Sequence, residues 1–400
     1  MRYGMRNFHI DSTLRLIVRI ATLGVIGSTM ACHGLLETTD PTRVSDEAIA
    51  NAAGANGRRL SAATQFHAQI ANIVRDIALF TDELGYDARA QYLSNNDRYG
   101  LDARDTAEYL GNFRFGPDDP HLGYMDWTIT KSSLAIPQIR LYAPDNLKRD
   151  YLAQMFAYRG FMIVQMAEDM CSGFPINDVT VDNQPMLSGP YSTDSALAYG
   201  IAQIDSALTN VKDSTPYLHL ASVVKGRALL DLGRYTEAAA AVANVPDNFV
   251  YGSNPNGYNP FYLCPECLWD SDGYPVGDGE GGNGLHFVSE NDTIRVPTRY
   301  VQGRLDDATK PEYTTTKYAT ENTPIVLASG QEARLIEAEV ALHNNGTDGA
   351  WLAKLNALRA PAGLDSLTDP GTDTGRVNLV YHERAFWMFL TGRRLGDMRR

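Results

Sequence analysis

Residues 221–242 read ASVVKGRALLDLGRYTEAAAAV, and this stretch decides the fold. Apolar residues recur at helical spacing on both sides of a break at Gly233. Small residues, including Gly226 and Ala238, stand where two helices joined by a short turn would cross closely. Pro246 then closes the segment. Such a pair of helices is typical of a tetratricopeptide unit, and a generic helical hairpin is the alternative.

Helical periodicity extends over most of the remaining chain. We expect helices over residues 60–80, 148–170, 194–209, 326–343, 347–359 and 378–390. Short strands are expected at residues 294–296 and 324–327. The sequence therefore predicts a mostly α protein: a tetratricopeptide-like helical-repeat scaffold with long irregular loops and few short strands. We expect the repeats at about 148–244 and 326–359.

Long segments without helical periodicity separate these helices, at residues 84–147, 171–193, 245–325 and 360–376. Loops of this length are functional or disordered. Residues 245–275 are rich in aromatic side chains, which disordered segments lack. We therefore expect a loop-rich ligand region at about 245–325.

Aromatic side chains beside amides and carboxylates suit a sugar, because flat rings stack on its C–H faces while polar groups bind its hydroxyls. The candidate ligand-binding residues are Tyr258, Tyr262, Trp269 and Tyr274, with Tyr124 and Trp127 as a second group. The alternative is that these rings pack the loops against the scaffold.

A glycine-rich acidic stretch is a candidate calcium site. Asp270, Asp272, Asp278 and Glu280 offer oxygen ligands on a flexible loop, which suits Ca²⁺. Their spacing departs from the helix-loop-helix calcium pattern, so a solvated loop is the alternative reading. No other cofactor is expected.

Cys264 and Cys267 flank a Pro-Glu pair, and we expect a local disulfide between them. Free thiols or half of a zinc site are the alternatives, although no second Cys or His pair stands at ligand spacing. Catalytic motifs such as G-x-S-x-G, H-E-x-x-H and a phosphate-binding glycine loop are absent from the sequence. A non-catalytic protein is expected, and a secreted glycoside hydrolase is retained as a rival because acidic residues are plentiful.

The first 31 residues have the order of a bacterial secretory signal: four arginines, a short apolar run over 20–30, and small residues before Cys32. We expect residues 1–31 to be a signal peptide and residues 32–400 to form a single domain. Lipidation of Cys32 would anchor the mature protein, and an ordinary signal peptide is the alternative. The apolar run is too short to span a bilayer.

The formal net charge of −13 argues against nucleic-acid partners. Four Arg and one Asp lie in residues 1–31, so the mature chain carries about −16. A surface this acidic repels nucleic-acid phosphates, and we expect no nucleic-acid binding.

The C-terminal segment, residues 381–400, reads YHERAFWMFLTGRRLGDMRR and is similar to the E-R-A-F-E-x-x-x-E-G-x-R-x-x-D-L-R-R ending of the SusD/RagB family. The segment QEARLIEAE at 331–339 and the start CHGLLETTDP at 32–41 resemble the same family. We place the family motif at 378–400. Its Glu383 and Arg384 are expected to begin a helix and to be structural, and Gly392 is expected to end that helix.

The resemblance implies a non-catalytic lipoprotein at the cell surface, anchored in the outer membrane. Its expected role is to bind a glycan or similar oligomeric nutrient and deliver it to a SusC-like TonB-dependent outer-membrane barrel. It also implies a chain that continues beyond Arg400. A helical-repeat scaffold for envelope assembly is the alternative function.

Overall fold

The computed structural model describes residues 46–84, 120–180, 183–253, 275–280, 284–302, 311–320 and 322–400. The chain divides into two units, residues 1–49 and 50–400, and only helix α2 (Asp46–Ile49) of the first is described. No helix within the described ranges is both long and apolar enough to cross a membrane. The second unit contains all the other described elements.

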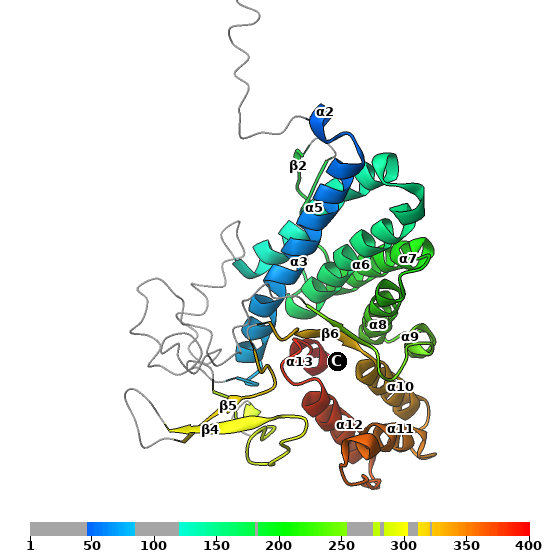
Figure 1. The fold of residues 1–400 in the computed structure, drawn as a ribbon. Helices are drawn as coiled ribbons and strands as arrows, with labels where there is room; N and C mark the ends of the chain where they lie inside the picture. Colours follow the sequence, from blue (N-terminus) through cyan, green and yellow to red (C-terminus); the bar gives the residue numbers. More distant parts are fainter. Residues whose placement is uncertain are drawn as a thin grey trace, which may run out of the picture. The chain divides into compact units, whose positions relative to one another are not determined.

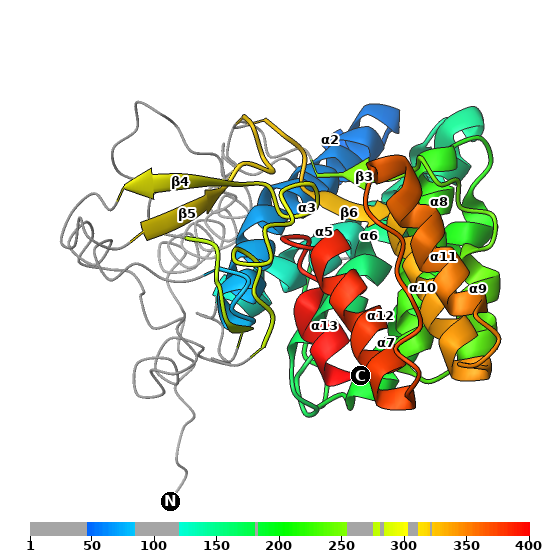
Figure 2. The ribbon, with the colours of Figure 1, turned by 90° about the horizontal axis from the view of Figure 1, so that it is seen from below.

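Helices dominate this unit (Figure 1). They are α3 (Ala52–Phe80), α5 (Pro120–Tyr142), α6 (Asp145–Asp169), α7 (Thr193–Asn210), α8 (Thr215–Asp231), α9 (Tyr235–Val242), α10 (Gly330–Asn344), α11 (Ala350–Arg359), α12 (Asp373–Trp387) and α13 (Arg394–Arg399), with a 3-10 turn η3 (Ala360–Ala362). Most helices pack against the next one in the chain, and α9 also packs against α10. In Figure 2, α10, α11 and α12 lie side by side. The predicted mostly α, helical-repeat fold is confirmed.

The described strands form three antiparallel pairs. They are β1 (Asp178–Val179) with β2 (Pro185–Met186), β3 (Val250–Gly252) with β6 (Val326–Ser329), and β4 (Thr298–Gln302) with β5 (Pro311–Thr315). The β3–β6 pair holds the chain after α9 beside the start of α10. Ser329 ends β6 and caps α10 through its hydroxyl, which accepts the Glu332 N–H at 3.1 Å.

The hairpin predicted at residues 221–242 is present as α8 and α9. Gly233 has φ +68°, which a glycine adopts without strain, and it turns the chain between the two helices. A Cβ added at Gly226 would lie 2.5 Å from Cγ1 of Val242, so only glycine allows this close crossing. Ala238 is fully buried on the opposite helix.

Several sequence-based boundaries are wrong. Helix α5 lies inside the segment 84–147 that was expected to be irregular, because buried hydroxyls such as Thr128 and Ser132 interrupt its apolar pattern. The helix expected at 326–343 begins as strand β6. Residues 294–296 are not a strand, and Ile294 is exposed to solvent.

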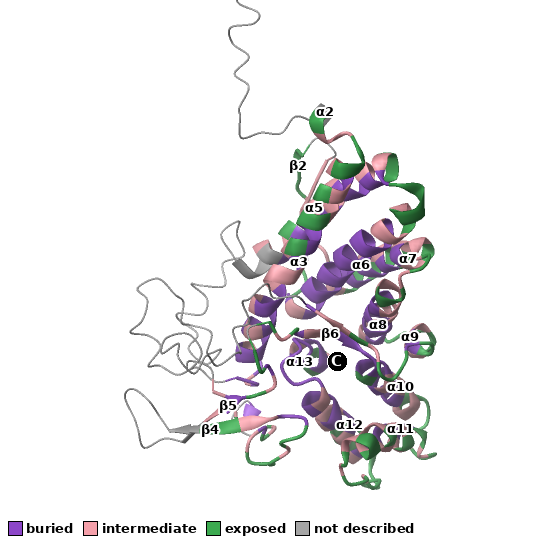
Figure 3. Cartoon of the chain, viewed as in Figure 1, coloured by how far each residue is buried: buried purple, intermediate pink, exposed green. Residues whose placement is uncertain are grey.

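The described residues form one large core and a smaller one. Figure 3 shows the buried residues concentrated on the facing sides of the helices. The smaller core lies between α10, α11 and α12, around the fully buried Trp351. The indole N–H of Trp351 donates to the Gly346 carbonyl at 2.9 Å, so the ring is both packed and hydrogen-bonded.

The C-terminal motif is structural, as expected, but its helix is displaced. Glu383 and Arg384 lie near the end of α12, which stops at Trp387, and Gly392 with φ +73° belongs to the turn that precedes α13. The α12 side chain Phe386 and the following Phe389 are fully buried.

Asp397 on α13 anchors this motif through buried ion pairs. One of its oxygens receives Nη2 of Arg384 and Nη2 of Arg400, each at 2.6 Å. Burial alone would raise the pKa of Asp397, but the two guanidinium groups outweigh it and lower the pKa to about 2. Arg400 also reaches Glu339 on α10 at 3.0 Å. The motif therefore joins the last helix to the repeat scaffold.

Candidate ligand-binding surface

Most residues proposed from the sequence as ligand-binding lie outside the described residues. These are Tyr258, Tyr262, Trp269 and Tyr274. The candidate lipidation and disulfide cysteines and two of the candidate calcium ligands also lie outside the described residues: Cys32, Cys264, Cys267, Asp270 and Asp272. Their predicted roles in stacking, lipidation, disulfide formation and calcium binding stay predictions.

Trp127 lies on α5 and is 54% exposed, the largest ring proposed from the sequence within the described residues. One helical turn further on, Lys131 donates from Nζ to the Ser61 hydroxyl on α3 at 3.1 Å. Tyr124 belongs to the same helix, and its side chain is outside the described residues. An exposed indole beside an ammonium and a hydroxyl fits a surface that contacts a sugar ring.

The two described members of the calcium hypothesis contact protein groups. Asp278 accepts the backbone N–H groups of Val288 and Ser289 at 3.0 and 2.9 Å. Glu280 receives Arg394 in a two-pronged ion pair at 2.5 and 2.6 Å. Within the described ranges, no group of three or more His, Cys, Asp or Glu side chains is arranged to hold a metal ion. Calcium binding stays a prediction.

Four side chains from four elements meet in what we call the tyrosine cluster: His67 on α3, Tyr158 on α6, Tyr217 on α8 and Tyr251 on β3. The Tyr158 and Tyr251 hydroxyl oxygens lie 2.7 Å apart, and Nε2 of His67 lies 3.1 Å from the Tyr158 hydroxyl. The Tyr217 ring meets the Tyr158 ring edge-on at a centroid distance of 6.1 Å. Tyr158 is buried and the other three are half-buried.

The tyrosine cluster is electrically neutral around pH 7. Burial lowers the pKa of His67 to about 4, so its imidazole is uncharged. Burial likewise raises the pKa of Tyr158, Tyr217 and Tyr251, so each keeps its hydroxyl proton. A neutral hydroxyl or imidazole can donate and accept hydrogen bonds, as sugar hydroxyls require.

Arg59 on α3 lies at the edge of the tyrosine cluster. Its Nη1 donates to Gln154 Oε1 at 2.7 Å, and its Nε and Nη2 donate to Asn56 Oδ1 at 3.0 and 2.8 Å. The guanidinium carbon stands 4.3 Å from the centroid of the Tyr151 ring. Gln154 in turn donates to the Tyr158 hydroxyl at 3.1 Å, which links Arg59 to the cluster.

Sequence reasoning missed this surface, although part of its signal was available. Tyr151, Gln154 and Tyr158 stand at positions i, i+3 and i+7 and so share one face of α6. Tyr251 lies just ahead of residues 254–274, which contain the four loop aromatics proposed from the sequence. The chain therefore leads directly from the tyrosine cluster into that segment.

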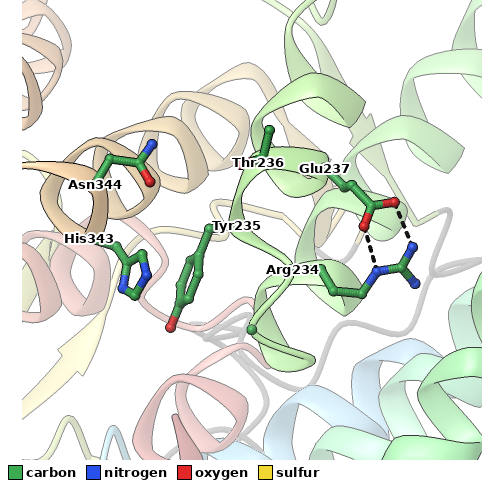
Figure 4. Close-up of a pocket in the computed structure, with 7 residues that line it drawn as sticks. Arg234, Tyr235, Thr236, Glu237, His343 and Asn344 are labelled. Carbon is green, nitrogen blue, oxygen red and sulfur yellow. Dashed lines mark hydrogen bonds and ion pairs between the residues drawn. The ribbon is translucent and has the colours of Figure 1, made fainter.

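A shallow hollow of about 280 Å³ opens elsewhere, at the turn between α8 and α9 and the end of α10. Figure 4 shows the rings of Tyr235 and His343 facing each other, and their centroids lie 3.6 Å apart. Arg234 and Glu237 pair with each other at its rim. These contacts join α9 to α10 and fix the first turn of α9. The residues that line the hollow therefore have structural roles, and we do not assign a ligand to it.

The geometry first defines a class, a tetratricopeptide-like helical scaffold that carries aromatic and polar side chains where α3, α6, α8 and β3 meet. Within that class, the fold is similar to that of solved SusD superfamily proteins, as the sequence resemblance predicted. No protein-family model and no curated protein matches the sequence.

Solved structures of SusD-like proteins are similar to this chain over most of its length. A SusD superfamily protein from Bacteroides vulgatus has 13% identity and a TM-score of 0.63, covering 87% of this chain and 88% of its own. Surface glycan-binding protein A from Bacteroides thetaiotaomicron has 14% identity and a TM-score of 0.61, with coverages of 88% and 90%. A laminarin-binding SusD-like protein has 14% identity and a TM-score of 0.61, with coverages of 87% and 91%. At identities this low, the structural similarity shows a shared fold and nothing more.

Proposed function

We propose that this protein is a non-catalytic, cell-surface lipoprotein that captures a glycan and delivers it to a TonB-dependent outer-membrane transporter. The main support is its SusD-like fold over 87% of the chain, shared with a SusD-like carbohydrate-binding protein. Lipid attachment at Cys32 and delivery to a barrel rest on the sequence resemblance.

The chemistry of the described surface supports a carbohydrate ligand. Trp127 offers a solvent-facing ring for stacking, and the tyrosine cluster offers uncharged groups that both donate and accept hydrogen bonds. The hydrogen-bonding partners described for the cluster are hydroxyl, imidazole and amide groups. Such groups bind sugar hydroxyls, whereas most glycoside hydrolases use a pair of carboxyl groups.

The direct test of capture is a binding measurement on the whole protein, purified from membranes in mild detergent. Isothermal titration against a panel of soluble polysaccharides should find at least one ligand. Trp127→Ala should then weaken binding about two- to tenfold, because an aromatic stacking contact contributes about 0.5–1.5 kcal/mol. Met398→Ala is the matched control, since Met398 is 52% exposed on α13. A panel without any binder, or release of reducing sugar from a polysaccharide, would contradict the proposal.

Delivery is tested by identifying what purifies with the protein from native membranes. A TonB-dependent barrel in stoichiometric amount is the expected result. Envelope assembly factors without a barrel would favour the scaffold alternative. Cys32→Ser should move the protein from the membrane to the soluble fraction, because the anchor would be lost.

A further inference from the structure

Arg59 carries a positive charge that no described carboxylate neutralises. Its hydrogen-bond partners are the amide oxygens of Asn56 and Gln154, and its ring contact is Tyr151. Two other arginines of the helical scaffold do pair with carboxylates. Arg159 on α6 pairs with Asp178 at 2.6 Å, and Arg227 on α8 pairs with Glu168 at 2.8 Å.

The helices around Arg59 are poor in acid. On α3, residues 52–74 contain no Asp or Glu, and the first acidic residue, Asp76, already pairs with Arg75. Residues 151–167 of α6 and 215–230 of α8 contain none either. The nearest acidic residue in the α6 sequence is Asp150, whose carboxylate accepts the backbone N–H groups of Lys212 and Ser214 just before α8. In a chain with a net charge of −13, the described side chains that contact Arg59 therefore carry no negative charge.

The guanidinium of Arg59 is held in a fixed position. Three of its five N–H groups are engaged by Asn56 and Gln154, and the other two have no partner among the described residues. Stacking over Tyr151 fixes the plane of the group. Gln154, which orients Nη1, is itself only 4% exposed. A rigid cation with spare donors is suited to an anion that arrives from outside, because little side-chain freedom is lost on binding.

We propose that Arg59 binds the anionic group of the captured glycan, so that the ligand is an acidic oligosaccharide carrying carboxylate or sulfate groups. This inference rests on the proposed glycan-binding function and specifies its substrate class. The planar carboxylate of a uronic acid matches the guanidinium fork, and a sulfate ester offers the same charge. The neutral hydroxyls of the tyrosine cluster would contact the sugar hydroxyls beside the charged group.

The experiment compares acidic and neutral ligands on the intact, detergent-purified protein by isothermal titration. The carboxylate pair is oligogalacturonate and its carboxyl-reduced counterpart, and the sulfate pair is dextran sulfate and dextran. The variants are Arg59→Gln, Arg59→Lys and the control Arg234→Gln. Arg234→Gln removes the same charge at a site away from the tyrosine cluster, because Arg234 lies at the start of α9 and pairs with the exposed Glu237.

We expect the wild type to bind one acidic ligand at least tenfold more tightly than its neutral counterpart. Arg59→Gln should lose at least tenfold in affinity for that ligand, Arg59→Lys should lose less, and Arg234→Gln should stay within twofold of the wild type. The inference is overturned if neutral glycans bind as well as acidic ones, or if Arg59→Gln binds like the wild type. Either result leaves the glycan-binding function standing, whereas failure to bind any glycan contradicts that function itself.

Discussion

Replacing Asp397 by Asn tests whether the C-terminal motif stabilises the fold. Asp397 is buried, and its carboxylate pairs with Arg384 and Arg400 at 2.6 Å each. The amide that replaces it removes the negative charge. Among the described carboxylates, Arg384, which is fully buried, then keeps only Glu339 at 3.5 Å. We expect the native state to lose stability because a buried cation loses its closest partner.

The magnitude follows from two independent arguments. Removing one partner of a buried ion pair costs about 3–5 kcal/mol. The pKa of Asp397 falls from 3.8 to about 2 in the folded protein, which corresponds to about 2 kcal/mol of stabilisation at neutral pH. The first value is larger because it includes the cost of leaving the buried Arg384 without its closest partner. We therefore expect a loss of about 2–5 kcal/mol.

The assay is urea unfolding followed by far-UV circular dichroism, with Asp373→Asn as the control. Asp373 also pairs with an arginine three residues away, Arg376, but its side chain is 97% exposed, so its removal should cost under about 1 kcal/mol. The pH dependence is a second test. A depressed carboxyl pKa stabilises the fold above pH 3.8, and this stability is lost as the pH falls through about 2. The Asp397→Asn variant should lack this loss.

Equal destabilisation by Asp397→Asn and Asp373→Asn would refute the reasoning. It would mean that the buried ion pairs of the motif contribute no more than an exposed pair. An unchanged acid transition in Asp397→Asn would contradict the assigned pKa in the same way.

Three further predictions concern packing, helix propensity and pH. Gly226→Ala should destabilise the protein by about 1–3 kcal/mol, because its Cβ would lie 2.5 Å from Val242 Cγ1. Gly57→Ala should instead stabilise it by about 0.5–1 kcal/mol, since nothing lies within 4 Å and α3 gains a better helix former; denaturant midpoints with equal slopes decide both. Burial lowers the pKa of His67 to about 4, so the folded state holds its imidazole neutral. The free energy of unfolding is therefore highest above pH 6.5 and falls as the pH drops toward 4. His67→Gln should reduce the fall in melting temperature between pH 7 and pH 4.5, and an unchanged fall would contradict the neutral imidazole.

The sequence predicted those parts of the fold that depend on local spacing. The α8–α9 hairpin follows from apolar and small residues at helical intervals, with Gly233 at the turn. The same rule failed for α5, where the buried hydroxyls of Thr128 and Ser132 look polar in the sequence. Their burial depends on packing against α3 and α6, which no local pattern encodes.

In the candidate site, too, some features follow from the sequence alone and others arise only when the elements pack. The exposed ring of Trp127 could be proposed from residue type alone. The tyrosine cluster could not, because His67, Tyr158 and Tyr251 come from elements far apart in the chain, and their hydrogen bonds exist only after those elements pack. Likewise, nothing in the sequence around Arg59 distinguishes it from the other arginines and lysines.

The sequence by itself therefore determined the helical repeats, the turn glycines and the C-terminal motif, since each depends on residues a few positions apart. Only the tertiary structure decided which side chains meet at the junction of α3, α6, α8 and β3. It also decided that the described contacts of Arg59 include no carboxylate. Both are distances between remote segments, and those distances are set by packing.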